Sequence, residues 1–475
     1  MAGKHVQESA LERALDAYAR GFQRWLPSPF TIAVMLTALA GCLALREATP
    51  HEVLDAWAQG LWNPGLIRFG FQAMFMLVLG HVLALAPPVL KALRRAIDWI
   101  VLTPAHAPAK VALLSMTLGW LNWGLGLIAG AILVRGVMDR RRAEGEASSL
   151  RKVSLGVLGA AGYTGLLVWH GGLGGSAPLK VAEKGHLASL VPNATWAAEL
   201  PDALTLSETA LTGWSQAVTW TTVVVVVLTF LWLGRRLGGG SDNVLPEVAE
   251  ARRALKKAEA RAEGLAERLD RGRVIPWVLG VACVVGATSW AWASGPLFEL
   301  AFVTPDWINM VLLGAALLAH GEVRGLLGAL DEAISGAAGI LVQFPLYFGI
   351  MGMVSGTGLG AWLAVSLVGA TSANWLPEAL FVSSGVLNVF VPSGGGQWAV
   401  QGPLVLEACH ALGVPLERGI MAMAFGDELT NMLQPFWALP LLGITGLSAR
   451  DILPYTLLVM GVAGAVMLAF LSFWA

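Results

Sequence analysis

The chain has 475 residues, of which 56% are hydrophobic and 13% are charged, and its formal net charge is -1. A soluble domain carries about 25% charged residues, so this composition and a mean hydropathy of +0.65 indicate a membrane protein. The near-neutral charge argues against a nucleic-acid partner, and three scattered cysteines do not form a disulfide framework.

The first 27 residues are charged and lack the apolar core of a signal peptide. Leu11, Leu15, Tyr18 and Phe22 recur at helical spacing. We therefore expect residues 1–27 to form an amphipathic helix at the membrane surface, before the first span.

A membrane-spanning helix needs about 20 mostly apolar residues. Two apolar stretches, 98–138 and 372–412, are too long for one span and are interrupted by glycine or proline near the middle. They are predicted to be re-entrant hairpins, the first and the second hairpin. The charged segment 235–273 has a helix-forming composition and is predicted to be a solvated loop. Nine segments are predicted to be spans: 28–46, 66–88, 153–175, 213–234, 274–294, 304–321, 336–357, 416–446 and 452–474.

Basic residues are distributed unevenly between the connecting loops. Lysine and arginine concentrate in 91–95, 135–152 and 235–273, whereas 176–212 contains only two lysines. By the positive-inside rule the basic loops are cytoplasmic and 176–212 is external. With a cytoplasmic N-terminus, the first hairpin enters from inside and the second from outside, so the halves 28–234 and 274–475 form an inverted repeat.

The second hairpin contains the sequence VPSGGGQWAVQGP at 391–403. Three consecutive glycines are unfavourable in a helix interior, and non-helical backbone survives at membrane depth only beside protein or a water-filled cavity. We expect Ser393, Gly394, Gly395 and Gly396 to form the hairpin tip and to present backbone amides to a substrate. Tight packing of the turn against neighbouring helices is the alternative.

The tip of the first hairpin is expected to be the counterpart of the second hairpin's tip in the inverted repeat. It reads LGWLNWGLG at 118–126, so Asn122, Trp123 and Gly124 are predicted substrate-binding residues. A small-residue helix-packing motif is the competing interpretation. In the second hairpin Gln397 is expected either to line the cavity or to cross-link helices.

Two spans carry breaks at matching positions, one in 153–178 and one in 416–446. His170 and Asp427 each stand eight residues before a proline, Pro178 or Pro435, and proline interrupts the helical hydrogen-bond ladder. Discontinuous helices in corresponding places of inverted halves indicate a secondary transporter's binding site. The predicted fold is an all-α polytopic membrane protein with two hairpins and two broken helices.

Carboxylates inside an apolar span are costly and usually functional. Of the neighbours Asp427 and Glu428 only one is expected to face the site, and we assign ion coupling to Asp427, with Thr430 one turn further. Asn431 is a predicted substrate ligand. His170 is either a proton carrier that also contacts substrate or a polar residue packed beside a tryptophan.

VPSGGGQWAVQGP resembles the signature of the short-chain fatty acid transporters, bacterial uptake permeases for acetoacetate and butyrate. The two hairpins and broken helices resemble the wider ion-transporter superfamily, which includes elevator-type carriers. The resemblance implies a multi-pass protein of the bacterial inner membrane that takes up a short monocarboxylate with protons or sodium. A dicarboxylate or other small organic anion carrier is the alternative, and an anion channel is the alternative of another class.

Enzyme and pump motifs are missing from the sequence. It has no H-E-x-x-H, no G-x-S-x-G and no P-loop, so we predict neither an enzyme nor a primary pump and no cofactor beyond a coupling H+ or Na+. The predicted partners are the monocarboxylate and the lipid bilayer, and a homodimer is left open.

Overall fold

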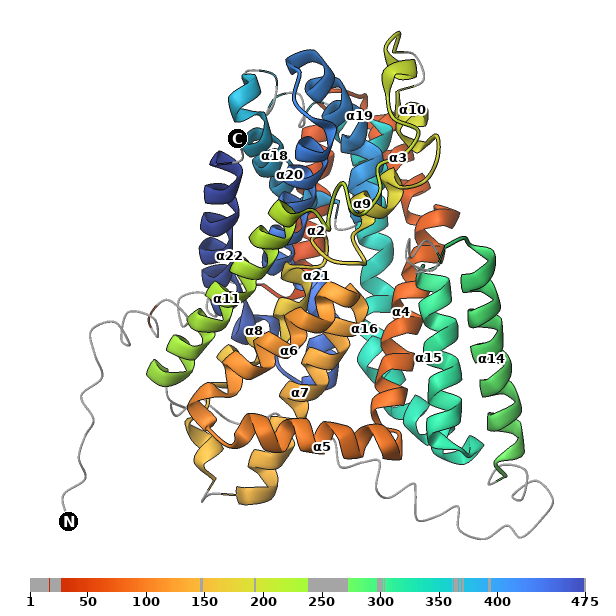
Figure 1. Cartoon of the computed structure of the whole chain (residues 1–475), viewed down its shortest axis with the longest axis vertical. Coiled ribbons are helices and arrows are strands. Elements are labelled where there is room, and N and C mark those ends of the chain that lie inside the picture. Colours follow the sequence, from red (N-terminus) through yellow and green to blue (C-terminus); the bar gives the residue numbers. More distant parts are fainter. Residues whose placement is uncertain are drawn as a thin grey trace.

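The computed structural model describes residues 27–145, 148–191, 194–237, 272–296, 304–360, 371–391 and 394–473, with a few single positions outside these ranges. Within them every regular element is a helix (Figure 1). The predicted N-terminal amphipathic helix, most of the 235–273 loop and Ser393 lie outside the described residues.

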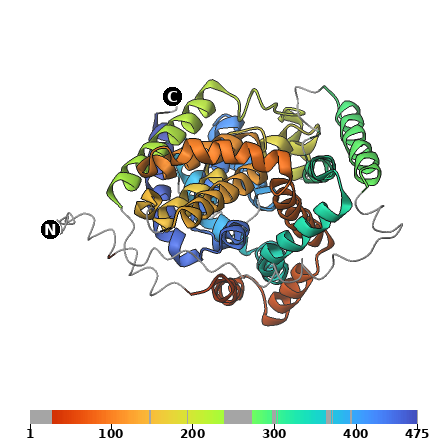
Figure 2. The same ribbon diagram turned by 90° about the horizontal axis from the view of Figure 1, so that it is seen from below.

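One group of helices lies at the side of the molecule. It comprises α2 (Pro29–Ala44), α3 (Pro50–Leu61), α4 (Pro64–Ala84), α14 (Val274–Ala293), α15 (Pro305–His320) and α16 (Val323–Gly356). In Figures 1 and 2 α14 lies at the edge of the molecule. The helices α3 and α16 pack backbone to backbone, because a Cβ added to Gly60 or Gly352 would meet main-chain atoms of the other helix.

Three helices differ from the prediction. Neither α3 nor α5 (Pro87–Val101) was expected, and α16 begins 13 residues before the predicted span 336–357. The helix α5 lies across the lower end of the molecule in Figure 1. Both α3 and α5 are amphipathic and begin at a proline, which is favourable at the first helical position. A search for long apolar runs overlooks such helices.

The first hairpin consists of α6 (Ala107–Leu121) and α7 (Trp123–Glu144). It starts later than the predicted residue 98, because residues up to 101 belong to α5 and the short turn η1 (Pro104–His106) intervenes. The break falls at Asn122, whose backbone is extended with φ -161° and ψ 131°. Its side-chain Oδ1 accepts hydrogen bonds from the N–H groups of Gly124 and Leu125, at 3.0 and 3.1 Å. Asn122 therefore caps α7.

The second hairpin consists of α18 (Leu376–Phe390), preceded by η7 (Ala373–Trp375), and α19 (Gly394–Leu412). The prediction that Gly394, Gly395 and Gly396 are non-helical is wrong, since they form the first turn of α19. The helical cost of glycine applies to a helix interior. In the first turn the backbone amides have no intrahelical acceptor in any case, so the amides remain oriented out of the helix end.

Two helices are broken. In the first half α8 (Leu155–Tyr163) continues into η4 (Thr164–Leu167), residues 168–175 are irregular, and α9 (Ser176–Val181) follows. In the second half α20 (Leu416–Thr430) and α21 (Pro435–Thr445) are separated by η8 (Asn431–Leu433). The remaining elements are η3 (Ser149–Lys152), α10 (His186–Leu190), η5 (Ala197–Glu199), α11 (Gly213–Arg236) and α22 (Ala449–Ser472).

By length and apolar composition three described helices could each cross a bilayer without interruption: α11, α14 and α22. The bent pair Pro50–Arg68 and Gly70–Leu83 could form a fourth crossing. The nine predicted spans are thus not nine continuous helices, because several are short, bent or broken.

The hairpins approach each other from opposite ends. Figure 1 shows α18, α19 and α20 in the upper half of the molecule and α6, α7 and α8 in the lower half. The irregular segment 168–175 lies between their tips: the N–H of Leu173 donates to the carbonyl of Trp120 at 2.8 Å, and a Cβ on Gly394 would approach His170. Both broken helices and both hairpin tips therefore meet at one place.

Candidate functional site

His170 and Asp427 lie at the centre of this meeting place. The imidazole Nε2 is 3.5 Å from Oδ2 of Asp427, and the two side chains are 0% and 1% exposed. The His170 ring packs on the indole of Trp169 with a centroid separation of 3.8 Å. The structure thus shows the packing beside tryptophan that one alternative expected, and it places the ring next to the carboxyl group of Asp427.

Glu428 also contacts His170. Its Oε2 accepts a hydrogen bond from the backbone N–H of His170 at 2.7 Å, and the side chain is fully buried. The expectation that only one of the two neighbouring carboxylates would face the site is wrong. The irregular backbone at 170 turns its amide toward α20, so Asp427 reaches the ring while Glu428 reaches the main chain.

The glycines of the second hairpin differ from one another. A Cβ on Gly394 would lie 2.9 Å from Nε2 of His170 and 2.9 Å from the Trp169 ring, so this glycine packs against the site. A Cβ on Gly395 would have nothing within 4 Å. Gly395 and Gly396 are partly exposed. Gly394 therefore permits close packing, whereas Gly395 lies beside open space.

At the first hairpin the predicted residues are placed mainly by packing. Trp123 meets Trp169 and Trp437 edge to face, with centroid separations of 6.4 and 5.2 Å. Gly124 is buried, and a Cβ there would collide with the sulfur of Met76 on α4. Asn122 uses its side-chain oxygen as a helix cap, and a substrate could use only its amide nitrogen.

Gln397 is buried inside the second hairpin. Its amide nitrogen donates to the carbonyl and the hydroxyl of Ser384 on α18, at 2.9 and 2.6 Å, and to Gln401 at 3.1 Å. Of the two predicted roles the structure supports the cross-linking of helices.

Thr430 and Asn431 surround a residue that the sequence reasoning missed. The Asn388 amide nitrogen donates to the Asp427 carbonyl at 2.7 Å, to Thr430 Oγ1 at 3.0 Å and to Asn431 Oδ1 at 3.0 Å. The available signal was a polar residue four positions after Ser384, on the same face of a mostly apolar helix.

Asn431 also joins the two broken helices. Its backbone carbonyl accepts a hydrogen bond from the Tyr163 hydroxyl at 2.7 Å, and the same hydroxyl lies 2.9 Å from the carbonyl of Gln434. Tyr163 is fully buried at the end of α8. The two helix breaks are thus held together by the main chain of one and a side chain of the other.

Several buried polar atoms at the centre have no hydrogen-bond partner within the described part of the chain. An unsatisfied buried donor or acceptor costs about 1–3 kcal/mol, and a charged one costs more. Proteins tolerate such a concentration where a ligand or a proton completes the site. These atoms are both ring nitrogens of His170, both carboxylate oxygens of Asp427, Oε1 of Glu428 and Nε1 of Trp169.

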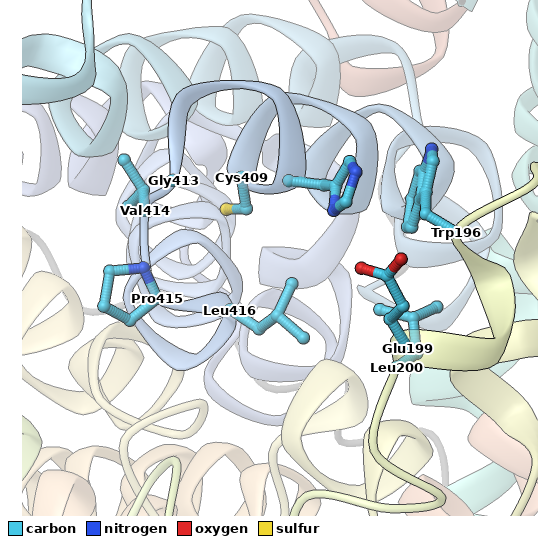
Figure 3. A pocket seen from close by; sticks show the side chains of 9 residues that line it. Trp196, Glu199, Leu200, Cys409, Gly413, Val414, Pro415 and Leu416 are labelled. Atoms are coloured by element: carbon cyan, nitrogen blue, oxygen red, sulfur yellow. The ribbon is translucent and has the colours of Figure 1, made fainter.

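No group of three or more His, Cys, Asp or Glu residues suited to a metal ion occurs among the described residues. A separate pocket of about 340 Å³ opens between the segment 196–200 and the α19–α20 turn (Figure 3). None of the unpaired atoms above belongs to its lining, which comprises Trp196, Glu199, Leu200, Cys409, His410, Gly413, Val414, Pro415 and Leu416. The buried cluster is the candidate site.

Among solved structures, the chain is similar to MtrF of Neisseria gonorrhoeae, titled as one of a class of antimetabolite efflux pumps. The TM-score is 0.43 at 14% identity, with 98% of this chain and 97% of that one covered. It is also similar to the Alcanivorax borkumensis YdaH transporter, with a TM-score of 0.45 at 16% identity, covering 94% and 98% of the two chains.

Two curated relatives have a higher sequence identity to this chain than these solved structures do. A protein of Escherichia coli K12 is 33% identical over 456 residues, covering 94% of this chain and 96% of the relative. One of Haemophilus influenzae is 32% identical over 437 residues, covering 91% and 93%. Each is named "Putative short-chain fatty acid transporter". A family model described as "Short chain fatty acid transporter" matches residues 10–474. The resemblance of VPSGGGQWAVQGP is confirmed, and the chain belongs to the short-chain fatty acid transporter family, a family of transporters and not of enzymes.

Proposed function

We propose that this chain is a secondary active carrier that takes up a short-chain monocarboxylate together with a proton across the bacterial inner membrane. The observation that carries the proposal is the buried pair of His170 and Asp427, 3.5 Å apart and between the tips of two hairpins. Neither the imidazole nitrogens nor the carboxylate oxygens have another hydrogen-bond partner in the described structure.

Charge explains why a proton would accompany the substrate. Asp427 and Glu428 place two carboxylates in the site, and neither pairs with a lysine or arginine among the described residues. Two like charges 4 Å apart repel by about 4 kcal/mol at an effective dielectric constant of 20. A substrate anion would therefore bind more tightly after a carboxylate or the imidazole takes up a proton, which links the two binding events.

Donors for one carboxylate are available in the same place. The first-turn amide of α19 at Gly395 lies beside open space at the positive end of a helix dipole. The Trp169 indole N–H is buried without a partner. None of the described ion pairs or hydrogen bonds of Asp427 and Glu428 involves a lysine or arginine, so a second substrate carboxylate would have no cationic partner there, which supports a monocarboxylate over a dicarboxylate.

Counterflow in proteoliposomes tests the function directly. Vesicles loaded with unlabelled acetoacetate are expected to accumulate labelled acetoacetate transiently, because a carrier exchanges substrate and a channel does not. Butyrate should compete with the label, and succinate should compete at least tenfold less well. Equilibration without an overshoot would favour the anion channel, and stronger competition by succinate would favour the dicarboxylate carrier.

We also propose alternating access by an elevator movement, with the N-terminus cytoplasmic. The basic loops support this orientation. Single cysteines at Gly395 and Leu125, in a protein without its own cysteines, are expected to react from opposite sides of the membrane, each more strongly in one state. Leu125 is 43% exposed and is preferred to Gly124, where a side chain would collide with Met76. Permanent labelling of both positions from one side would contradict the inverted arrangement.

A further inference from the structure

Asn388 has a role that the proton-coupling argument does not use. It is fully buried near the end of α18 and faces the break between α20 and η8. Three oxygen atoms surround its amide nitrogen at 2.7–3.0 Å: the carbonyl of Asp427, Oγ1 of Thr430 and Oδ1 of Asn431. We call these three atoms the oxygen cluster.

The hydrogen-bond network fixes the orientation of the Asn388 amide. A backbone carbonyl such as that of Asp427 can only accept, and Nδ2 of Asn431 is directed to the carbonyl of Leu166 at 3.4 Å, which leaves Oδ1 of Asn431 facing Asn388. Reversing the Asn388 amide would put its oxygen against two acceptors. The nitrogen is therefore the atom inside the oxygen cluster.

The oxygen cluster has the composition of a small cation site. A main-chain carbonyl at a helix break, a hydroxyl and an amide oxygen are ligands of hard cations, and the end of α20 contributes the negative end of a helix dipole. Broken helices in secondary transporters hold coupling cations with such groups. An amide group has two hydrogens for three acceptors, so the cluster has more acceptor capacity than Asn388 fills.

We propose that the amide nitrogen of Asn388 occupies the position that a monovalent cation would otherwise take, as a donor tethered to α18. The oxygen cluster then needs no sodium ion to be satisfied. Asn388 is thus a positioning residue that sets the ion requirement of the second helix break. The effect of Asn388 on ion coupling rests on the transport function proposed above. That its amide nitrogen takes the place of a cation can be tested by ion binding alone, without a transport assay.

The test replaces the amide donor of Asn388 with the carboxylate acceptors of aspartate. Thermal unfolding is measured on the purified full chain in detergent, in sodium chloride against choline chloride at equal ionic strength. The wild-type midpoint is expected to be the same in both salts. In Asn388→Asp the carboxylate faces three oxygens, so the midpoint should fall in choline and rise saturably with sodium, by about 5 °C at roughly a hundredfold excess over the dissociation constant.

A second substitution separates the oxygen cluster from other sodium sites. Adding Thr430→Val to Asn388→Asp removes one of the three oxygens and should abolish the sodium response. If Asn388→Asp folds in neither salt, the test uses Asn388→Ala, which removes the amide from the oxygen cluster without adding charge. Sodium chloride should again stabilise this variant more than choline chloride does.

Two results would overturn the proposal. One is a folded position-388 variant without any preference for sodium over choline. The other is a sodium-specific stabilisation of the wild type that Thr430→Val removes, since the cluster would then hold a cation in the presence of Asn388. Failure of the proton-coupled function is recognised separately, as sodium-driven or absent accumulation by the wild type in proteoliposomes.

Discussion

Asp427→Asn is expected to abolish proton-driven accumulation while it preserves substrate exchange. The amide keeps the shape of the carboxylate beside His170 but cannot titrate, so substrate binding no longer depends on proton uptake. The amide group would stand at the same separation from the imidazole Nε2, where Oδ2 of Asp427 now lies at 3.5 Å. The amide of Gly395, which is proposed to hold the substrate, is not altered.

The expected loss of substrate accumulation in Asp427→Asn is large. For one proton per substrate, a pH difference of about two units supports roughly 100-fold accumulation, since each unit is worth about 1.36 kcal/mol. In Asp427→Asn the ratio should fall to about one, with counterflow within about threefold of wild type. The accumulation ratio is measured at the plateau of uptake, with either a pH gradient or a sodium gradient as the driving force. Protein-free vesicles report diffusion of the undissociated acid and are subtracted.

Glu428→Gln is the matched comparison. Its oxygen can still accept from the backbone N–H of His170, as Oε2 of Glu428 does now at 2.7 Å, so this variant should retain pH-driven accumulation at a reduced rate. Normal accumulation by Asp427→Asn together with loss in Glu428→Gln would move the coupling role to Glu428. Accumulation driven by sodium alone in the wild type would refute proton coupling.

Gly394→Ala is expected to reduce uptake at least tenfold and to lower the unfolding midpoint. Its Cβ would lie 2.9 Å from Nε2 of His170 and 2.9 Å from the Trp169 ring, so the hairpin tip or the His170 ring must move. Helix propensity would not explain such a loss, because the difference between glycine and alanine applies to a helix interior and Gly394 is the first residue of α19. A net loss of stability therefore reports the packing of the tip.

Gly461→Ala is the control for this substitution. Gly461 lies in α22, and a Cβ there has nothing within 4 Å, so this variant should transport like the wild type with an equal or higher midpoint. Initial uptake rates normalised to protein amount, together with thermal unfolding, compare the two. Wild-type transport by Gly394→Ala would show that the tip does not rest on His170 in the working protein.

The sequence by itself determined the helical hairpins, the positions of both helix breaks and the family. These features depend on local chemistry: proline removes a backbone donor from the helical hydrogen-bond ladder, and long apolar runs favour helices in a membrane because a helix satisfies its own backbone groups. The equal spacing of His170 and Asp427 from their prolines also indicated a shared site, and the structure places their side chains 3.5 Å apart.

Only the tertiary structure decided what each polar side chain contacts. From local sequence Asn122, Gln397 and Thr430 looked alike, as polar residues near a helix break. Asn122 turned out to cap α7, Gln397 to bind Ser384 across the hairpin and Thr430 to accept from Asn388, which lies 42 positions away in the sequence.

The neighbours Asp427 and Glu428 show why local sequence does not determine these contacts. Adjacent residues on a regular helix point about 100° apart, which suggested that only one could face the site. The irregular backbone at His170 offers a ring to one carboxylate and an amide to the other. This arrangement depends on the packing of two chain segments about 258 residues apart, which no local pattern encodes.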